Sequence, residues 1–581
     1  MTLYTSNLVK KVIGFTGLSL MCMQLNFAQI VDLHNLKGYI KKESIFDYTG
    51  ALTASTIYTS NKGANQPPLT WMVGLNTSVS LFKLINVPFS FTYTNLGGNY
   101  KLPQTPNQFS FSPTYKWVAT NIGVVNTTWS PYSLNGHQFV GASVDLTPTG
   151  SPFSLSALYG RFAQAINFDS TNQAFASASY RRMGGGLKVN YTKEKYNLGV
   201  SVFTAKDDAN SIHLFPKTEV PKPGQNLVMT YVFGITPFKG LTLSGEMASN
   251  FLTADLTDNS EGDQSQYKIV GRFFNIRNST TMTKAGKAAL NYTLTKPQAT
   301  IGVQYERIDP NYLTYGSYFM ANDLENYTVN LTQTLFNNKV TLALNGGRQR
   351  DDLNNSKGSK NSRNIGSITV GFVPNTRVNL NVSYSNFTAF MFIKPVEQIY
   401  SPYPIYQQSD TSNFKQVNEN ANFNFNYILK DNELLNRSLM ATFSYQNANN
   451  SVGDVIQAEG GSKIYSSIAS YNQVWKKRGL NGSLTYTHNL SSMTTGQTVT
   501  QGPTLAVNKT LNKAIRIGYG LSYIMLQIPN KANATILNNK LSVAYAQKKF
   551  SVQLSLINQQ KSGAIKGQDL LGNLNLAYQI K

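Results

Sequence analysis

Arginine follows a run of alternating apolar residues at three places in this chain, twice with a tyrosine two positions before it. A tyrosine ring with its polar hydroxyl suits a membrane interface, and a guanidinium group can hold a phosphate through two hydrogen bonds. The pattern predicts contacts with lipopolysaccharide phosphate, although ordinary solvated strand ends would look the same. The residues concerned are Tyr159, Arg161, Tyr305, Arg307, Arg348 and Arg350.

Enzymatic chemistry finds little support in the sequence. The four histidines stand far apart and show no spacing that would hold a metal ion. The glycine run Gly184-Gly185-Gly186 opens a strand rather than a helix, so it does not form a phosphate-binding loop. Acidic pairs such as Asp351-Asp352 lie at loop starts, where solvated turns are the simplest interpretation. We therefore predict no catalytic, cofactor-binding or metal site, and a protein that is not an enzyme.

The elements that carry these residues are strands with one apolar and one polar face. In the stretch 377–386, Val378, Leu380 and Val382 alternate with Asn379 and Asn381. Side chains alternate faces along a strand, and asparagine does not fill a dry core cheaply. The polar faces must therefore meet water, and apolar faces that meet lipid make a transmembrane β-barrel.

Breaks between these strands alternate between short turns and long loops, as periplasmic turns and extracellular loops do in such barrels. They predict an all-β fold: a single large antiparallel transmembrane β-barrel of about 26 strands, with 22 to 28 acceptable. The short turns include 295–298 and 336–339, and the last strand covers 570–580. The long loops are predicted at 95–108, 163–184, 206–225, 251–283, 389–418 and 447–461.

The start of the chain is typical of a secretory signal peptide over residues 1–28. Lys10 and Lys11 supply its positive charge, and a mostly apolar run leads to a cleavage site at Ala28-Gln29. Residues 29–45 would form a short periplasmic segment, and residues 46–581 the barrel. That segment is too short for an N-terminal plug domain or for periplasmic modules. The only cysteine, Cys22, lies inside the predicted signal, so no disulfide framework is expected.

The formal net charge of +23 favours an anionic partner. Because the basic residues are scattered rather than clustered, we expect outer-membrane lipid and lipopolysaccharide as partners, and no nucleic acid. The predicted location is the outer membrane of a Gram-negative bacterium, as a multi-pass β-barrel.

A barrel of this size needs something to fill its lumen. The loops 251–283 and 389–418 could fold inward, a protein partner could occupy the lumen, or the barrel could be flattened. The loop 387–406 is rich in apolar residues, and such a surface marks either an interface or internal packing. We predict that it meets a partner or the lumen through Phe390, Phe392, Tyr400, Tyr403 and Tyr406.

Several segments resemble large outer-membrane β-barrel proteins of Bacteroidota, a group with no settled biochemical role. The resemblance spans about Phe46 to Asn386 and implies an outer-membrane location and a large barrel. It is carried by the stretches 109–117 (FSFSPTYKW), 153–162 (FSLSALYGRF), 305–312 (YERIDPNY), 323–331 (DLENYTVNL) and 347–353 (GRQRDDL).

Three functions fit these observations. The first is a conduit or scaffold subunit of an outer-membrane transport or assembly complex, with the lumen filled by loops or by a partner. The second is a porin-like passive channel for small solutes. The third is a secreted soluble β-sheet adhesin, whose apolar faces would have to be buried against one another. Around 26 strands without a domain break favour the first two.

Overall fold

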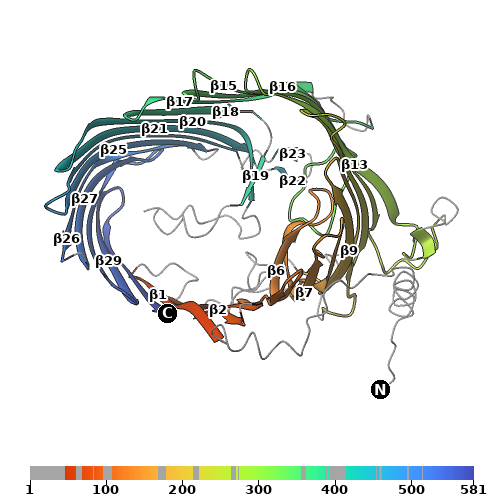
Figure 1. Cartoon of the computed structure of the whole chain (residues 1–581). Coiled ribbons are helices and arrows are strands. Elements are labelled where there is room, and N and C mark those ends of the chain that lie inside the picture. The colour runs from red at the N-terminus through yellow and green to blue at the C-terminus, as the bar shows by residue number, and fades with distance from the viewer. Residues whose placement is uncertain are drawn as a thin grey trace.

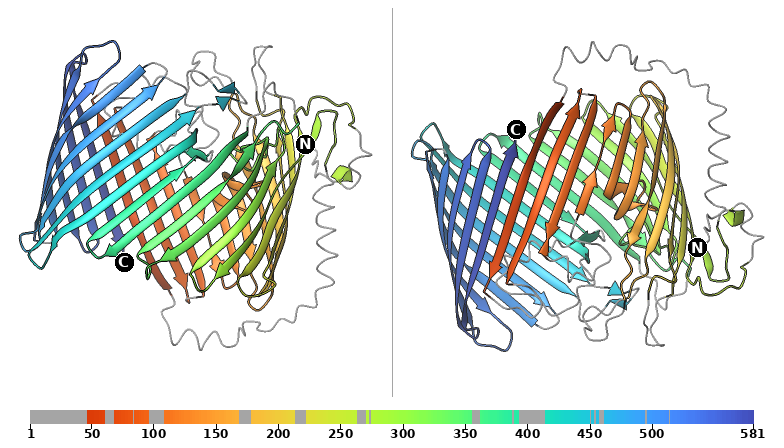
Figure 2. Two further views of the ribbon diagram at one scale, coloured as in Figure 1. Left: turned by 90° about the horizontal axis from the view of Figure 1, so that it is seen from above. Right: turned by 90° about the horizontal axis from the view of Figure 1, so that it is seen from below.

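The computed structural model describes residues 46–60, 68–82, 84–95, 108–167, 178–212, 222–262, 270–272, 274–354, 362–386, 389–392, 414–449, 451–452, 455–456, 461–493, 496–512 and 514–581. These residues form one closed ring of tilted antiparallel strands (Figure 1, Figure 2). The predicted signal peptide and the segment 29–45 lie outside the described residues. None of the described helices is long and apolar enough to cross a membrane.

The barrel is built from consecutive neighbours in chain order. The first strands are β1 (Phe46–Thr59), β2 (Leu69–Leu81), β3 (Ile85–Thr94), β4 (Gln108–Phe111), β5 (Thr114–Tyr115), β6 (Val118–Thr128), β7 (Asn135–Leu146), β8 (Phe153–Ala163), β9 (Arg182–Lys193) and β10 (Tyr196–Asp207). The middle strands are β11 (Gln225–Ile235), β12 (Leu241–Thr253), β13 (Thr280–Leu294), β14 (Ala299–Ile308), β15 (Leu324–Leu335), β16 (Val340–Arg350), β17 (Ser362–Asn375), β18 (Val378–Ser385), β19 (Ala389–Phe392) and β20 (Phe414–Asp431). The last are β21 (Leu435–Asn449), β24 (Ser462–Trp475), β25 (Leu480–Met493), β26 (Gly496–Leu511), β27 (Ile515–Gln527), β28 (Ala534–Gln547), β29 (Phe550–Gly563) and β30 (Gly567–Ile580).

The predicted strand number is confirmed. Both β4 and β5 pair with β3 and β6, and both β18 and β19 pair with β20, so each couple makes one crossing of the wall. The described wall therefore has 26 antiparallel strands. The ring closes between β1 and β30, from Gly50 opposite Ile580 to Thr59 opposite Leu571. Two further elements do not belong to the barrel sheet: a small hairpin of β22 (Ser451–Val452) with β23 (Val455–Ile456), and the 3-10 helix η5 (Val270–Arg272).

Turns and loops separate to opposite ends of the barrel. The end that carries Phe46 and Ile580 also carries the short turns, and we call it the turn end. At the turn between β15 and β16, Asn337 and Asn338 adopt positive φ angles of 55° and 67°, which asparagine tolerates. The other end carries the long connections, and we call it the loop end. The predicted alternation of short turns and long loops is thus confirmed.

The two faces of the wall differ as the alternation predicts. Ile301 and Val303 on β14, for example, are 46% and 49% exposed on the outer face. On the inner face, Asn381 of β18 lies opposite Asn424 of β20. Apolar side chains that remain exposed around a closed barrel are suited to lipid, whereas amides are suited to a wet lumen.

Candidate functional site: two loops inside the barrel and the wall they leave uncovered

Two connections at the loop end turn inward and meet inside the ring, although they lie far apart in the sequence. The first is residues 129–134 between β6 and β7, and the second is residues 309–323 between β14 and β15. We call them the lumenal loop pair. Figure 1 shows an orange and a green loop inside the ring, on the side of β9 and β13. Their backbones form a parallel bridge between Leu134 and Gly316, and the Asn135 amide donates to the Gly316 carbonyl at 2.8 Å.

Side chains strengthen this contact between the loops. The Tyr312 hydroxyl donates to the Tyr132 carbonyl at 2.8 Å, and the Thr314 hydroxyl donates to the Ser133 carbonyl at 2.7 Å. Glycine is required at position 316 because a Cβ there would lie 2.4 Å from the Ser133 carbonyl oxygen. The loop pair is therefore a packed unit rather than two independent loops.

An apolar core joins the loop pair to the inner face of the wall. Tyr132 and Tyr312 are fully buried against Val228, Ala248 and Ala285. A second cluster places Leu134 among aromatic rings of β7, β8 and β10, with Phe139 and Phe162 stacked at 4.8 Å between ring centroids. Burial of this much apolar surface holds the loops against strands that would otherwise line the lumen.

A row of alternating charges on the inner wall lies beneath the loop pair. Glu246 of β12, Lys287 of β13 and Glu306 of β14 are successive cross-strand neighbours. Glu306 accepts from the Tyr132 hydroxyl at 2.7 Å, while Glu246 accepts a short hydrogen bond from the Ser130 hydroxyl. Charged wall residues thus satisfy polar groups of the first loop.

The pKa values of three tyrosines in the lumenal loop pair are raised by burial. Burial raises the pKa of Tyr132, and the nearby carboxylate of Glu306 raises it further. Burial likewise raises the pKa of Tyr312 and, with the same cause, raises the pKa of Tyr318 to about 12. Deprotonation of Tyr132 or Tyr312 would place a phenolate in a fully buried site, so both phenols are held neutral.

Polar side chains of the wall also hold the second loop through its backbone. The Tyr315 amide donates to Asn226 at 3.0 Å, and Asn250 donates to the Leu313 carbonyl at 3.0 Å. The Arg182 guanidinium lies 3.4 Å from the centroid of the Tyr315 ring while it pairs with Asp207 at 2.8 Å. These contacts fix the loop in one position.

The remaining wall, from β15 through β30 to β3, presents mainly amides and hydroxyls to the lumen. One cross-strand row of this face runs from Asn330 to Asn345 and Ser367, and another joins Asn381, Asn424 and Thr442. Charges on its last strands include Lys540 and the paired Lys561 and Asp569. We call this surface the polar wall. It can hydrogen-bond to polar molecules with little selection by charge.

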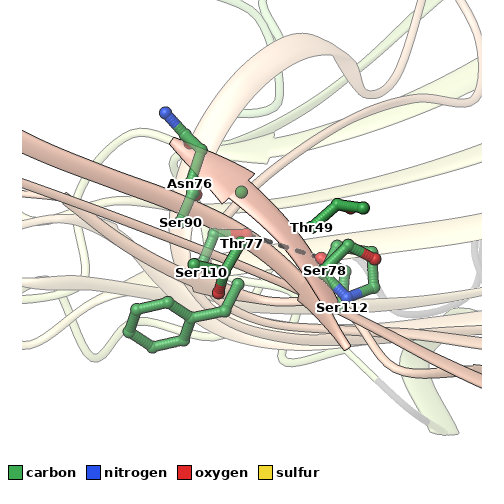
Figure 3. A pocket seen from close by; sticks show the side chains of 10 residues that line it. Thr49, Asn76, Thr77, Ser78, Ser90, Ser110 and Ser112 are labelled. Atoms are coloured by element: carbon green, nitrogen blue, oxygen red, sulfur yellow. Dashed lines mark hydrogen bonds between the residues drawn. The ribbon is translucent and has the colours of Figure 1, made fainter. Parts of the chain in front are cut away.

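A crevice of about 300 Å³ lies at the edge of the polar wall, lined by residues of β1, β2, β3 and β4 (Figure 3). Hydroxyl groups of Thr49, Ser78 and Ser90 line it together with Asn76, and Ser110 faces Ser112 with 3.5 Å between their oxygens. The crevice offers neutral hydrogen-bonding groups, as the rest of this wall does.

Of the two loops that the sequence offered as inward-folding, 389–418 lies largely outside the described residues. The described part of 251–283 does not fold inward, because Phe274 and Ile276 pack against Leu227, Phe251 and Met282. These partners belong to the outer register of β11, β12 and β13. The loop therefore covers the outside of the wall, and Figure 1 shows its yellow-green segment outside the ring.

The apolar loop 387–406 lies largely outside the described residues, including Tyr400, Tyr403 and Tyr406. Phe390 and Phe392 lie on β19, opposite Gln416 and Phe414 of β20. The predicted role of this loop stays a prediction. In contrast, Pro131 and the Asp309-Pro310 pair interrupt the alternating pattern at both lumenal loops, a signal that sequence reasoning could have used.

The predicted phosphate contacts divide into two groups. Tyr305, Arg307, Arg348 and Arg350 come together on the outer face of β14 and β16. Tyr159 and Arg161 lie on the outer register of β8, which five strands separate from β14. Among the described residues, no three histidine, cysteine, aspartate or glutamate side chains are grouped so that they could hold a metal ion.

Comparisons with known proteins do not assign this chain to a family. No family model matches the chain, and no curated protein matches it. Among solved structures it is similar to the P pilus usher (PapC) translocation pore, with 8% identity, a TM-score of 0.40, and coverage of 92% of this chain and 99% of that one. It is also similar to the ferric enterobactin receptor of Pseudomonas aeruginosa, with 10% identity, a TM-score of 0.40, and coverage of 92% and 80%. At this level of similarity the functions of those proteins carry no argument for this chain.

Proposed function

We propose that this chain is a non-enzymatic barrel of the Gram-negative outer membrane that serves as a conduit subunit of a transport or assembly complex. The observation that carries this proposal is the asymmetry of its inner surface. The lumenal loop pair fills the side of β7 to β14, whereas the polar wall stays facing the lumen. Cargo would move along the polar wall.

The chemistry of the polar wall supports a conduit for polar cargo. Amides and hydroxyls both donate and accept hydrogen bonds, so they replace water around a moving polar chain without binding it tightly. Strong rings of one charge would select small ions instead. The described strands of this wall mix a few lysines with Asp569 among many neutral groups.

A porin-like channel for small solutes is the second candidate, and the same neutral wall favours it. The adhesin alternative loses support from the fold, since its apolar faces would have to pack against one another. In the closed barrel these faces remain exposed, as Leu484 and Leu505 show at 54% and 51%.

The test of the proposal is purification of the tagged full chain from its native membrane in mild detergent, with mass spectrometry of co-eluting proteins. A stoichiometric protein that cross-links to photoreactive groups on the polar wall, for example at Asn424, is the expected result. The same probe at Leu484 on the outer face serves as control. A lone barrel that conducts ions in planar bilayers would refute the complex and establish the porin-like channel.

A further inference from the structure

Six outward side chains near the loop end of β14, β15 and β16 form two adjacent cross-strand rows. We call them the rim patch. One row is Tyr305, Tyr327 and Arg348, and the other is Arg307, Glu325 and Arg350.

Glu325 organises the rim patch. Its carboxylate accepts a hydrogen bond from the Tyr305 hydroxyl at 2.6 Å and a short one from Arg350, and it lies 3.8 Å from Arg307. The Glu325 side chain is only 3% exposed, whereas those of Arg307 and Arg350 are 43% and 57% exposed. The carboxylate thus fixes the inner edges of two guanidinium groups and leaves their outer edges accessible.

The two arginines that contact Glu325 stay partly exposed although both are paired. Arg307 also pairs with Asp309 at 3.3 Å, yet its side chain is 43% exposed, and that of Arg350 is 57% exposed. The patch continues the outer register of Val303 and Val329, which are among the exposed apolar residues. Exposed guanidinium groups beside a lipid-facing band are stable where they meet water or anionic oxygens.

We propose that the rim patch binds a phosphate group of an outer-leaflet lipid headgroup. The exposed guanidinium edges would grip the phosphate oxygens in two-pronged geometry, while Tyr327 would lie along the acyl region at the interface. This site is independent of what passes through the lumen and requires only that the barrel lies in a membrane.

Arg161 on β8 provides a matched comparison within the same chain. It follows Tyr159 in the same outward register, but its cross-strand neighbours are Val140 and Met183. A single arginine between apolar neighbours lacks the preorganised cluster, so it should hold a phosphate far more weakly.

The experiment measures lipid retention by native mass spectrometry of the full chain in mild detergent, with phosphorylated and dephosphorylated lipid A as probes. We expect the triple variant Arg307→Gln, Arg348→Gln, Arg350→Gln to lose phosphorylated lipid A by at least tenfold, because it removes three groups that donate charged hydrogen bonds and a tenfold change corresponds to only about 1.4 kcal/mol. The Arg161→Gln variant should retain it, and all variants should keep wild-type conductance.

Equal retention by the triple variant, or equal binding of the dephosphorylated lipid, would overturn the proposal. Displacement of the lipid by an equimolar amount of inorganic phosphate would show that the site takes a free anion instead. Should the triple variant fail to fold, Arg348→Gln alone leaves every Glu325 contact described above in place. It is expected to weaken binding about tenfold, and unchanged binding would again contradict the site.

Discussion

The hydroxyl of Tyr312 donates a hydrogen bond to the backbone carbonyl of Tyr132 across 180 residues of sequence, inside the barrel and away from lipid. Both rings are fully buried, and each belongs to a loop that leaves the wall and returns to it. This contact ties the loop after β6 to the loop after β14, so the inward obstruction is formed jointly by two distant parts of the chain.

Tyr312→Phe should weaken this obstruction without removing it. The change leaves the Tyr132 carbonyl without its donor while it keeps the buried ring, at a cost of about 1 kcal/mol. We expect a lower midpoint temperature of barrel unfolding in heat-modifiability gels. In single-channel recordings we expect more frequent transitions to a higher conductance. Tyr519→Phe removes an exposed outer-face hydrogen bond to Asn539 and should change neither property. Identical behaviour of the two variants would contradict the role of Tyr312.

Gly316→Val should separate the two loops. Any Cβ at this position meets the Ser133 carbonyl and the Leu134 backbone, and a branched side chain leaves no room for relaxation. The expected result is a larger single-channel conductance with an unchanged gel shift of the folded barrel. Gly346→Val is the matched control, because a Cβ there meets no atom within 4 Å. A wild-type conductance for Gly316→Val would show that the loops do not obstruct the lumen.

Alkaline pH should loosen the loop pair. The pKa values of Tyr132, Tyr312 and Tyr318 are raised above the ordinary value of 10, so the folded loops hold these protons more tightly than the unfolded chain does. Their contribution to stability is complete below pH 10 and falls as the pH rises above it, toward about 12 for Tyr318. Conductance should therefore increase above pH 10, and phenolate absorbance of these tyrosines should appear in the same step. In the Tyr132→Phe, Tyr312→Phe double variant, the increase in conductance above pH 10 should be smaller than in the wild type. A full increase in that variant would contradict the assignment.

The loop on the outside of the wall should matter for stability and not for passage. Phe274→Ala removes a buried ring that packs with Leu227 and Phe251, at a cost of about 3 kcal/mol. We expect easier proteolysis of the segment after β12 and normal conductance. Phe238→Ala, in an exposed turn, should leave both unchanged. Altered conductance in Phe274→Ala would place this loop in the lumen after all.

The strands could be predicted from the sequence because alternation is a local property. The apolar neighbours of Asn379 and Asn381 show which face of the strand each asparagine occupies. Such local alternation was enough to predict the number of strands and the order of turns and loops. The direction in which a loop folds is not local. Phe274 is apolar in either location, and only the pairing of β11, β12 and β13 supplies its outward partners. The bond between Tyr312 and Tyr132 likewise depends on two loops that no short pattern connects.

In the proposed conduit, the polar wall lines the passage and the lumenal loop pair covers the opposite side. Single-channel current in a Cys22→Ser background, which leaves no other cysteine, tests this arrangement. Asn424→Cys places a thiol on the polar wall, and Ala248→Cys places one beneath the loop pair, where the side chain is fully buried. We predict that a charged, membrane-impermeant thiol reagent reduces the current through Asn424→Cys and leaves Ala248→Cys unaffected. A reduced current in Ala248→Cys with an unchanged current in Asn424→Cys would show that the passage does not follow the polar wall.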